Sequence, residues 1–354
     1  MLLLSFVKLC NAQDLPSERS VNWANAGLKN IQTSNFEIIE MQNFSIVNDG
    51  KIANDSFLTN ALATVSNNGA VLVFPSGEFL FNNTINLPSN VIIKGDGANK
   101  TTFLMDLSGA NNAISIKGNL INSITTTITQ TALKGSNSIE VLNATEFEVG
   151  DWIQIFMDDS GLITSDWAKG SVGQIVEISS INLNQIILSS ALRMDFDKSN
   201  SLYIKKIEPI KNVGIECLKI KRLDDTAPSQ TSSVYFEYAV NSWVKGIESS
   251  NTTFSHIEAK NSSNLSISNS YFHHAFDYGG NGRAYGVVLH FTTNESLVEN
   301  NIFEHLRHSV LVQAGANGNA FLYNYSLDPF WTSSPSNAAG DVVLHGNYPF
   351  ANLF

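Results

Sequence analysis

Three strands in the C-terminal part of the chain share one pattern, and this repeat constrains the fold more than any other feature. Residues 285–290, 308–313 and 340–345 each alternate aliphatic side chains and end on a polar residue, and these ends lie 23 and 32 positions apart. Repeats of this length with one short strand each are typical of a solenoid in which every repeat forms a coil. Parallel strands then stack about 4.8 Å apart, so equivalent residues form columns.

Asparagine is unusually frequent, with 41 in the chain, and three asparagines recur at the coil turns. Asn269, Asn300 and Asn324 each follow a short apolar strand, at spacings of 31 and 24 positions. We expect their side chains to stack as a buried amide ladder that stabilises the turns. Because Asn, Ser and Thr favour turns over helix interiors, the sequence predicts a β-rich protein.

The composition and net charge argue against a disordered chain, a nucleic-acid partner and a membrane span. Charged residues make up only 15% of the chain and hydrophobic residues 43%, so the chain is expected to fold rather than stay disordered. Its net charge of −11 argues against nucleic acid as the partner, since phosphate binding requires a basic face. No apolar run approaches the roughly 18 residues that a membrane span needs.

The sequence divides into four segments. Residues 1–13 are expected to be a signal peptide with an apolar core, so the protein is expected to be secreted, periplasmic or extracellular. Residues 14–123 form an N-terminal module, in which Ser56 to Ser66 have the spacing of an amphipathic helix. Residues 124–208 contain short alternating strands without the coil repeat, which predicts an inserted antiparallel β subdomain. Residues 209–354 are the C-terminal coils; they end without a cap, so we expect a truncated chain.

A set of motifs in the N-terminal module carries a family resemblance. The motifs occur in one order along the chain: Asp49-Gly50, Asn54-Asp55, Phe74-Pro75-Ser76-Gly77 and Lys94-Gly95-Asp96-Gly97. Residues 46–105 therefore resemble the N-terminal module of the pectate lyase superfamily, in its rhamnogalacturonase/epimerase-like group. The resemblance implies a right-handed parallel β-helix that is capped at its N-terminal end by the predicted helix. We expect the antiparallel insertion, which the strand pattern of residues 124–208 predicts, to ride on this β-helix. The group includes lyases, hydrolases, epimerases and phage tailspikes, so the resemblance leaves the reaction open.

All seven histidines lie between residues 256 and 345, which directs attention to the C-terminal coils. If the alternating Val and Leu residues of the repeat point inward, then His290, Gln313 and His345 point outward as one column. Histidine exchanges protons near neutral pH, so His290 and His345 are candidate catalytic residues and Gln313 a candidate substrate ligand. The alternative is a solvated column without chemistry.

Arg307 and His308 precede the middle strand of the repeat and are further catalytic candidates. An arginine can pair bidentately with a uronate carboxylate, and the resemblance implies a basic residue that removes the neighbouring proton. The alternative is that Arg307 pairs with Glu299 or Glu304 and fixes the turn.

Several other residues are candidate sugar ligands. His274 and His305 follow successive turns and form a second column. Two loops, 277–286 and 327–340, interrupt the repeat and carry aromatic side chains that suit carbohydrate stacking. We expect the groove between these loops to hold Arg307, His308 and at least one of His290 and His345. The candidate substrate ligands are Gln313, Arg283, Tyr285, Trp331, His274 and His305.

These features favour a polysaccharide lyase that acts by β-elimination on an acidic, uronate-containing glycan. A glycoside hydrolase is the first alternative and would need paired carboxylates, with Glu299, Glu304 and Asp341 as candidates. The second is a non-catalytic, glycan-binding or adhesive β-helix. The resemblance allows Ca²⁺ as a cofactor, but the sequence shows no clear cluster of aspartates to hold it, so the metal stays unassigned.

Overall fold

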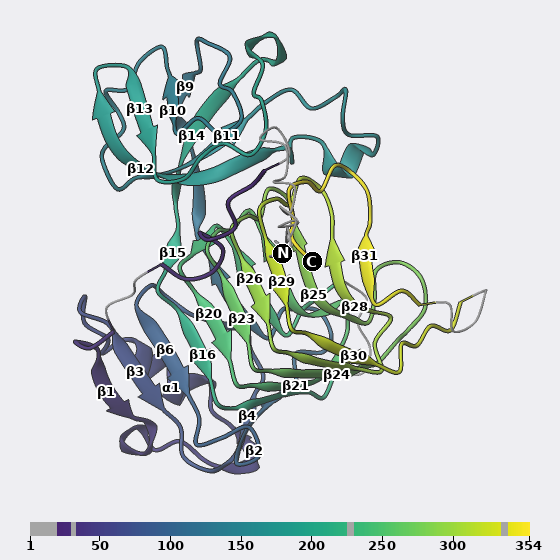
Figure 1. The fold of residues 1–354 in the computed structure, drawn as a ribbon. Helices are drawn as coiled ribbons and strands as arrows, with labels where there is room; N and C mark the ends of the chain where they lie inside the picture. The colour runs from purple at the N-terminus through teal and green to yellow at the C-terminus, as the bar shows by residue number, and fades with distance from the viewer. Residues whose placement is uncertain (1–19, 30–32, 225–229, 334–338) are drawn as a thin grey trace, which may run out of the picture.

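The computed structural model describes residues 20–29, 33–224, 230–333 and 339–354. Three parallel sheets wind around one core as a β-helix, and the predicted fold class is confirmed (Figure 1). The segment 1–13, predicted to be a signal peptide, lies outside the described residues. Within the described ranges, no helix is long and apolar enough to cross a membrane.

Each coil contributes one strand to each of the three sheets. The first sheet contains, in spatial order, β1 (Glu37–Glu40), β3 (Ala70–Val73), β6 (Val91–Lys94), β16 (Gly214–Glu216), β20 (Trp243–Lys245), β23 (Ser266–Ser268), β26 (Leu297–Glu299) and β29 (Ala320–Leu322). The second contains β2 (Asp49–Ala53), β4 (Gly77–Phe81), β7 (Thr101–Met105), β17 (Lys219–Arg222), β21 (Glu248–Thr252), β24 (Tyr271–Ala275), β27 (Ile302–Glu304) and β30 (Tyr325–Leu327). The third contains β5 (Ile85–Asn86), β8 (Ile114–Lys117), β18 (Val234–Glu237), β22 (Ser255–Lys260), β25 (Tyr285–His290), β28 (His308–Val312) and β31 (Val342–Leu344). A two-stranded parallel pair, β15 (Ile210–Lys211) and β19 (Ala239–Val240), joins two of the turns.

Stacked inward side chains form the core of the coils. In the N-terminal coils the ring centroid of Phe103 lies 4.7 Å from that of Phe74 and 4.9 Å from that of Phe81, and all three rings are fully buried. Further along, aliphatic side chains of the third sheet continue the same core column. The alternation that predicted the coils is therefore the alternation between core and outer face.

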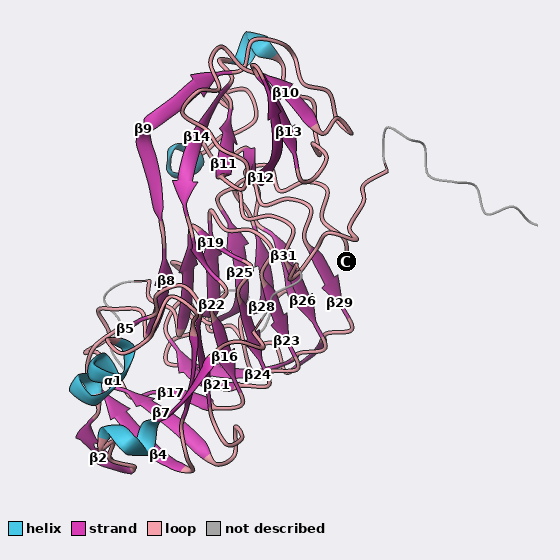
Figure 2. Ribbon diagram, turned by 90° about the vertical axis from the view of Figure 1, so that its left-hand side faces the viewer, coloured by secondary structure: helices cyan, strands magenta, loops and turns pink. Residues whose placement is uncertain are grey.

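The N-terminal motifs have a local structural role. Helix α1 (Asp55–Leu62) confirms the predicted helix and buries Leu58 and Ala61 at the N-terminal end of the stack (Figure 2). The Asn54 side chain is buried and makes two hydrogen bonds with the backbone of Val47: its Oδ1 accepts from the Val47 N–H and its Nδ2 donates to the Val47 carbonyl, at 2.8 Å each. The Asp55 carboxylate accepts from two backbone N–H groups of the loop after β4. A short 3-10 helix, η1 (Met41–Phe44), packs beside α1.

Two of the three asparagines predicted to form a buried amide ladder are exposed, and at one of these turns the next residue, Asn301, is buried instead. Asn269 and Asn300 are exposed and take left-handed φ values of 53° and 51°, a conformation that asparagine tolerates well. The ladder is formed by Asn301, which is buried, and by Asn324: the Asn324 Oδ1 accepts from both the backbone and the side-chain amide of Asn301, at 3.1 and 3.0 Å. Asn269 and Asn300 also pair with each other, since the Asn300 Nδ2 donates to the Asn269 Oδ1 at 2.6 Å, so their predicted stacking is present but exposed.

The insertion is a six-stranded antiparallel sheet outside the coil stack. Its spatial order is β10 (Ser138–Glu140), β13 (Gln185–Leu188), β12 (Gly173–Asn182), β11 (Trp152–Phe156), β14 (Tyr203–Glu208) and β9 (Asn119–Thr127), with two 3-10 helices, η2 (Asp166–Ala168) and η3 (Lys198–Asn200). The sheet has its own apolar core and stands above the coils in Figure 2.

The insertion leaves and rejoins the coil at one point. The chain departs after Gly118, and a Cβ at this glycine would lie 2.5 Å from the Glu208 carbonyl oxygen and 2.8 Å from the Ile210 nitrogen. The first and last residues of the insertion are therefore in direct backbone contact with the coil that carries them.

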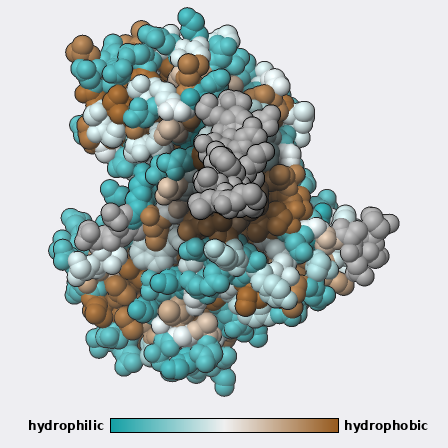
Figure 3. All heavy atoms as spheres, viewed as in Figure 1, coloured by the Kyte–Doolittle hydropathy of each residue, from teal (hydrophilic) through white to brown (hydrophobic). Residues whose placement is uncertain are grey.

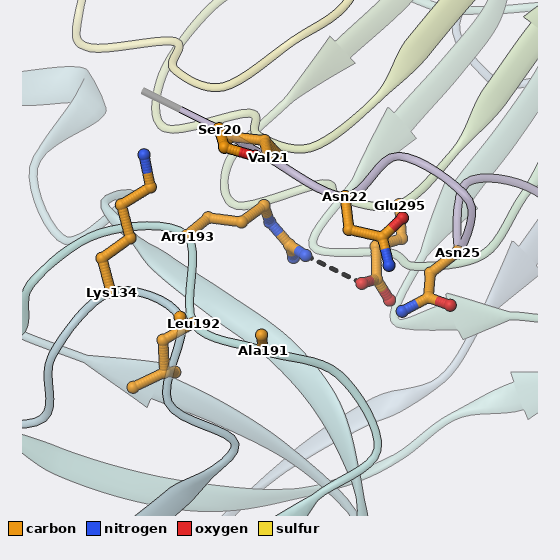
Figure 4. A pocket seen from close by; sticks show the side chains of 10 residues that line it. Ser20, Val21, Asn22, Asn25, Lys134, Ala191, Leu192, Arg193 and Glu295 are labelled. Atoms are coloured by element: carbon orange, nitrogen blue, oxygen red, sulfur yellow. Dashed lines mark hydrogen bonds and ion pairs between the residues drawn. The ribbon is translucent and has the colours of Figure 1, made fainter. Parts of the chain in front are cut away.

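A buried ion pair joins the insertion to the β-helix. Arg193 of the insertion donates from Nη1 to Glu295 Oε1 at 2.8 Å and from Nε to Asn317 Oδ1 at 2.6 Å. Figure 4 shows this pair in a small pocket of about 170 Å³, beside Asn22 and Asn25 of the N-terminal segment. The N-terminal segment closes the junction because the Asn264 amide donates to the backbone oxygens of Asn25 and Gly27.

The face of the molecule that is seen in Figure 1 is largely hydrophilic, as the space-filling view in Figure 3 shows. Figure 3 shows an apolar patch on this face over the C-terminal strand β31, where Val342 and Leu344 are 54% and 58% exposed. These two positions continue the inward columns of β25 and β28, and among the described residues no strand stacks on them.

Candidate functional site

A groove of about 580 Å³ runs along the outer face of the third sheet. Strands β22, β25 and β28 form its floor, the glycine-rich loop before β25 forms one wall, and the insertion contributes to another. The groove is lined by Trp167, Gln230, Phe254, Glu258, Asn281, Gly282, Tyr285, His290, Phe291, Arg307, Leu311, Gln313 and His345.

The strand alternation places the polar column on this floor. Val287 and Leu289 point into the core of the coils, whereas Val288 belongs to a separate outer cluster with Tyr285 and Leu311. His290 therefore points outward, and the backbone N–H groups of Gln313 and His345 bond the strands before them. The predicted column of His290, Gln313 and His345 lies on neighbouring strands of one sheet, and all three line the groove.

His290 is held between two side chains. Its Nε2 lies 3.1 Å from Glu258 Oε1, and its Nδ1 lies 3.4 Å from the Gln313 Nε2. The second oxygen of Glu258 accepts from the Ser232 hydroxyl at 2.7 Å, which fixes the carboxylate. A carboxylate at Nε2 and an amide N–H at Nδ1 assign the proton to Nε2, so Nδ1 carries the lone pair. The arrangement orients an imidazole base and stabilises its imidazolium form.

Arg307 is held by rings and not by a carboxylate. Its guanidinium carbon lies 4.7 Å from the Trp331 ring centroid and 5.7 Å from that of Tyr285, and its Nη1 donates to the Gly279 carbonyl at 3.1 Å. The alternative ion pair with Glu299 or Glu304 does not form. Glu299 lies in the first sheet, and Glu304 accepts from the Tyr271 hydroxyl in the second.

The charge of Arg307 is thus directed to the groove. Among the described residues no carboxylate forms an ion pair with Arg307, and its buried Nε has no hydrogen-bond partner there. Aromatic faces support a guanidinium without neutralising it. This cation is available to an anionic group of a ligand.

His308 lies behind the groove wall rather than in it. Its Nδ1 lies 2.7 Å from the Gly340 carbonyl oxygen, and its ring stacks on Tyr285 at 5.1 Å. Burial lowers the pKa of His308 below its ordinary value. His308 is therefore suited to a structural role, since its ring packs on Tyr285 and its Nδ1 bonds the backbone just before β31. His345, in contrast, is exposed at the groove rim.

The remaining predicted ligands do not line the groove. His274 and His305 form the expected second column, with ring centroids 5.0 Å apart, but His274 lies in β24 and His305 directly follows β27, so the column belongs to the second sheet and not to the third. Arg283 pairs with Asp277 at 3.2 Å. Trp331 contacts the groove residue Arg307 but does not itself line the groove, and neither do the other described residues of the 327–340 loop; the insertion contributes Trp167.

The described residues do not gather a metal site. Nowhere in the described ranges do three His, Cys, Asp or Glu side chains cluster in a way that could hold a metal ion. The side chains of the groove therefore do not fit the Ca²⁺ that the resemblance allows, and the chemistry is derived from the groove residues alone.

The sequence analysis missed two groups of groove residues. Glu258 lies one coil before His290, in register with Val288, and extending the repeat backward by one coil identifies its outward position. Trp167 comes from the insertion, and no repeat or motif connects it to the coils. Phe291 directly follows β25, and its ring centroid lies 5.7 Å from that of Trp167.

Comparisons with known proteins agree with this fold. Residues 38–185 match the family described as rhamnogalacturonase A/epimerase, pectate lyase-like, so the predicted resemblance is confirmed. The chain is 28% identical over 145 residues to a capsule K1-specific depolymerase of Klebsiella phage K64-1, which covers 40% of this chain and 16% of that protein.

Two solved structures share the fold. The tailspike protein gp49 of Pseudomonas phage LKA1 is 18% identical with a TM-score of 0.61, over 80% of this chain and 51% of that one. The ORF18 protein of Geobacillus virus E2 is 13% identical with a TM-score of 0.51, over 89% and 47% of the two chains. The chain thus spans about half the length of these two structures and a much smaller part of the curated relative.

Proposed function

We propose that this chain, a pectate lyase-like parallel β-helix, cleaves a uronate-containing polysaccharide by β-elimination. One observation carries the proposal: a single groove holds an imidazole backed by a carboxylate and a guanidinium that has no carboxylate partner among the described residues. A base and a separate cation are the two groups that proton removal beside a carboxylate requires.

The groove residues divide the reaction between them. Arg307 pairs with the uronate carboxylate and stabilises the negative charge that develops as the neighbouring C5–H bond breaks. When the Gln313 amide turns from the His290 Nδ1 to the bound sugar, His290 takes the C5 proton on Nδ1, and Glu258 stabilises the imidazolium. The electron pair of the C5–H bond becomes the C4–C5 double bond, the C4–O bond breaks, and His345 protonates the leaving oxygen. Gln313 and Tyr285 orient the sugar.

The substrate class rests on the relatives as well as on the groove. The curated relative is a depolymerase specific for a K1 capsule, and the gp49 structure is a phage tailspike. We therefore take an acidic capsular polysaccharide as the substrate class. Such a substrate lies outside the cell, so the protein would act there, in line with the expected signal peptide.

The groove supports a lyase better than a hydrolase. Glu258 is the one carboxylate that lines the groove among the described residues, and a hydrolase needs two carboxylates that flank the glycosidic bond. The three hydrolase candidates lie elsewhere. Glu299 and Glu304 are in the other two sheets, and Asp341 accepts a hydrogen bond from the Ser326 hydroxyl.

A panel assay tests this proposal directly. The full chain is incubated with polygalacturonate, alginate, hyaluronan and purified K1 capsular polysaccharide, and the unsaturated product is followed by its ultraviolet absorbance. We expect one of these glycans to be cleaved. Glu258→Gln should lower the turnover about 10²- to 10⁴-fold, because it removes the charge that supports the base. Glu304→Gln, in the second sheet, is the matched control and should leave turnover unchanged.

Three results would contradict the proposal in different ways. New reducing ends without ultraviolet absorbance would indicate a hydrolase. Tight binding without any cleavage would indicate an adhesive protein. Loss of less than tenfold in the Glu258→Gln variant would remove His290 and Glu258 from the mechanism, even if cleavage by elimination is observed.

A further inference from the structure

A loop of the insertion is fixed in place although it lies at the surface. The loop spans residues 159–172, and its ends are tied by the buried Asp159. The two carboxylate oxygens of Asp159 accept from the backbone N–H groups of Gly170 and Val172, at 3.0 and 3.1 Å. Ile163 and Ala168 anchor the loop in the core of the insertion. The conformation between these anchors is therefore determined by the fold.

The same loop is also bonded to the coils. The Thr292 hydroxyl, just after β25, donates to the Ser171 carbonyl at 2.6 Å, and the Ser165 N–H donates to Asn347 Oδ1 at 3.3 Å. Gly315 permits this close approach because it has φ +72° and because a Cβ there would lie 2.0 Å from the Ser171 oxygen. These contacts hold the segment of the loop that contains Trp167 over the groove.

The Trp167 side chain is not buried in the core, although the loop that carries it is fixed. The residue surface of Trp167 is 49% exposed, and its ring packs in a T-shaped arrangement with that of Phe291, with centroids 5.7 Å apart and planes at 73°. The ring lines the groove together with His290 and His345. A large aromatic ring that is held still, half in water and beside polar side chains, is a stacking surface ready for a ligand.

We propose that Trp167 is a sugar-stacking, specificity-determining residue, so that the insertion selects the glycan that the coils cleave. The inference rests on the proposed function, because the occupant is a pyranose ring of the same polysaccharide. A pyranose presents an apolar C–H face to an indole and its hydroxyl groups to the polar side chains of the floor. Covering the exposed half of the indole corresponds to about a 10- to 100-fold change in Kd.

The test measures binding apart from turnover. The Glu258→Gln variant is titrated with the panel glycan that the wild-type protein cleaves, and Trp167→Ala and Trp167→Phe are introduced into the same background. We expect Trp167→Ala to raise Kd about 10- to 100-fold and Trp167→Phe to restore most of the affinity. Leu183→Ala is the matched control: it removes a side chain that is 90% exposed on the insertion and does not line the groove, and it should leave Kd unchanged.

Turnover in the wild-type background gives the second readout. Trp167→Ala should raise KM and change kcat little, because the ring holds the sugar without touching the reacting atoms. A Kd within twofold of the parent would overturn the inference while leaving the lyase proposal intact. If the protein with Trp167 binds none of the panel glycans, the proposed function fails and this inference with it.

Discussion

The ion pair between Arg193 and Glu295 makes a quantitative prediction about how the insertion is attached. Both side chains are almost fully buried, with 5% and 3% of their surfaces exposed. Arg193→Met removes the cation and one donor to Asn317 but leaves the Glu295 carboxylate in place. A buried charge that has lost its partner typically costs about 3 to 5 kcal/mol. We therefore expect the free energy of unfolding to fall by that amount.

The double variant separates the ion pair from the packing around it. Arg193→Met combined with Glu295→Gln removes both charges and keeps similar side-chain volumes, so most of the lost stability should return. The assay is denaturant unfolding of the four proteins, followed by fluorescence of the five tryptophans.

The outcome is decided by the coupling energy. We expect the two single substitutions to be non-additive by more than about 2 kcal/mol. Additive effects, or a loss below about 1 kcal/mol for Arg193→Met, would show that Glu295 is solvated when its partner is removed and that the junction does not exclude water. In that case the rigidity that we assign to the insertion would have to come from its backbone contacts alone.

Two further predictions concern the groove and the core. Arg307→Gln should lower kcat/KM for an acidic glycan about 10²- to 10³-fold, because one donor to a developing charge is lost, and an unchanged value in the steady-state assay would refute the role of Arg307. Burial lowers the pKa of His256 well below its ordinary 6.5, so the unfolded chain takes up a proton near that pH while the folded chain does not. The free energy of unfolding should then fall as the pH drops below 6.5, by at most about 1.4 kcal/mol per pH unit from this group, and His256→Gln should flatten the slope in denaturant titrations at several pH values.

The coil repeat explains why the fold was predictable. Parallel stacking makes each coil a copy of the previous one, so alternation in β25 and β28 is sufficient to place Val287 inward and His290 outward. The prediction of the buried asparagine at one turn was wrong by one residue, since Asn301 and not Asn300 is buried. The sequence shows Asn300 and Asn301 side by side, and only the backbone conformation decides which of them takes the left-handed φ and which is buried.

The site was predictable only along the repeat. His290, Gln313 and His345 follow from the coil period, whereas extending their column back by one coil gives Lys260; Glu258 lies two residues earlier, opposite Val288, on the same outward face. His308 was misplaced because the strand pairing sets it opposite Tyr285, so its ring stacks there instead of reaching the groove. Trp167 could not be predicted at all, since the orientation of the insertion depends on contacts such as Ser171 with Thr292 that no sequence period records.

The backbone contact at Gly118 has a consequence for how such a protein can change over evolutionary time. Because the insertion departs and returns at adjacent backbone atoms, another module could replace it there without breaking the backbone path of the coil, provided that it also supplies a partner for Glu295. The floor of the groove and the ring above it are then encoded by stretches of chain that can be inherited separately. If the insertion selects the glycan as we propose, recombination at this junction would change the polymer that is recognised and would leave the stacked strands of the β-helix unchanged.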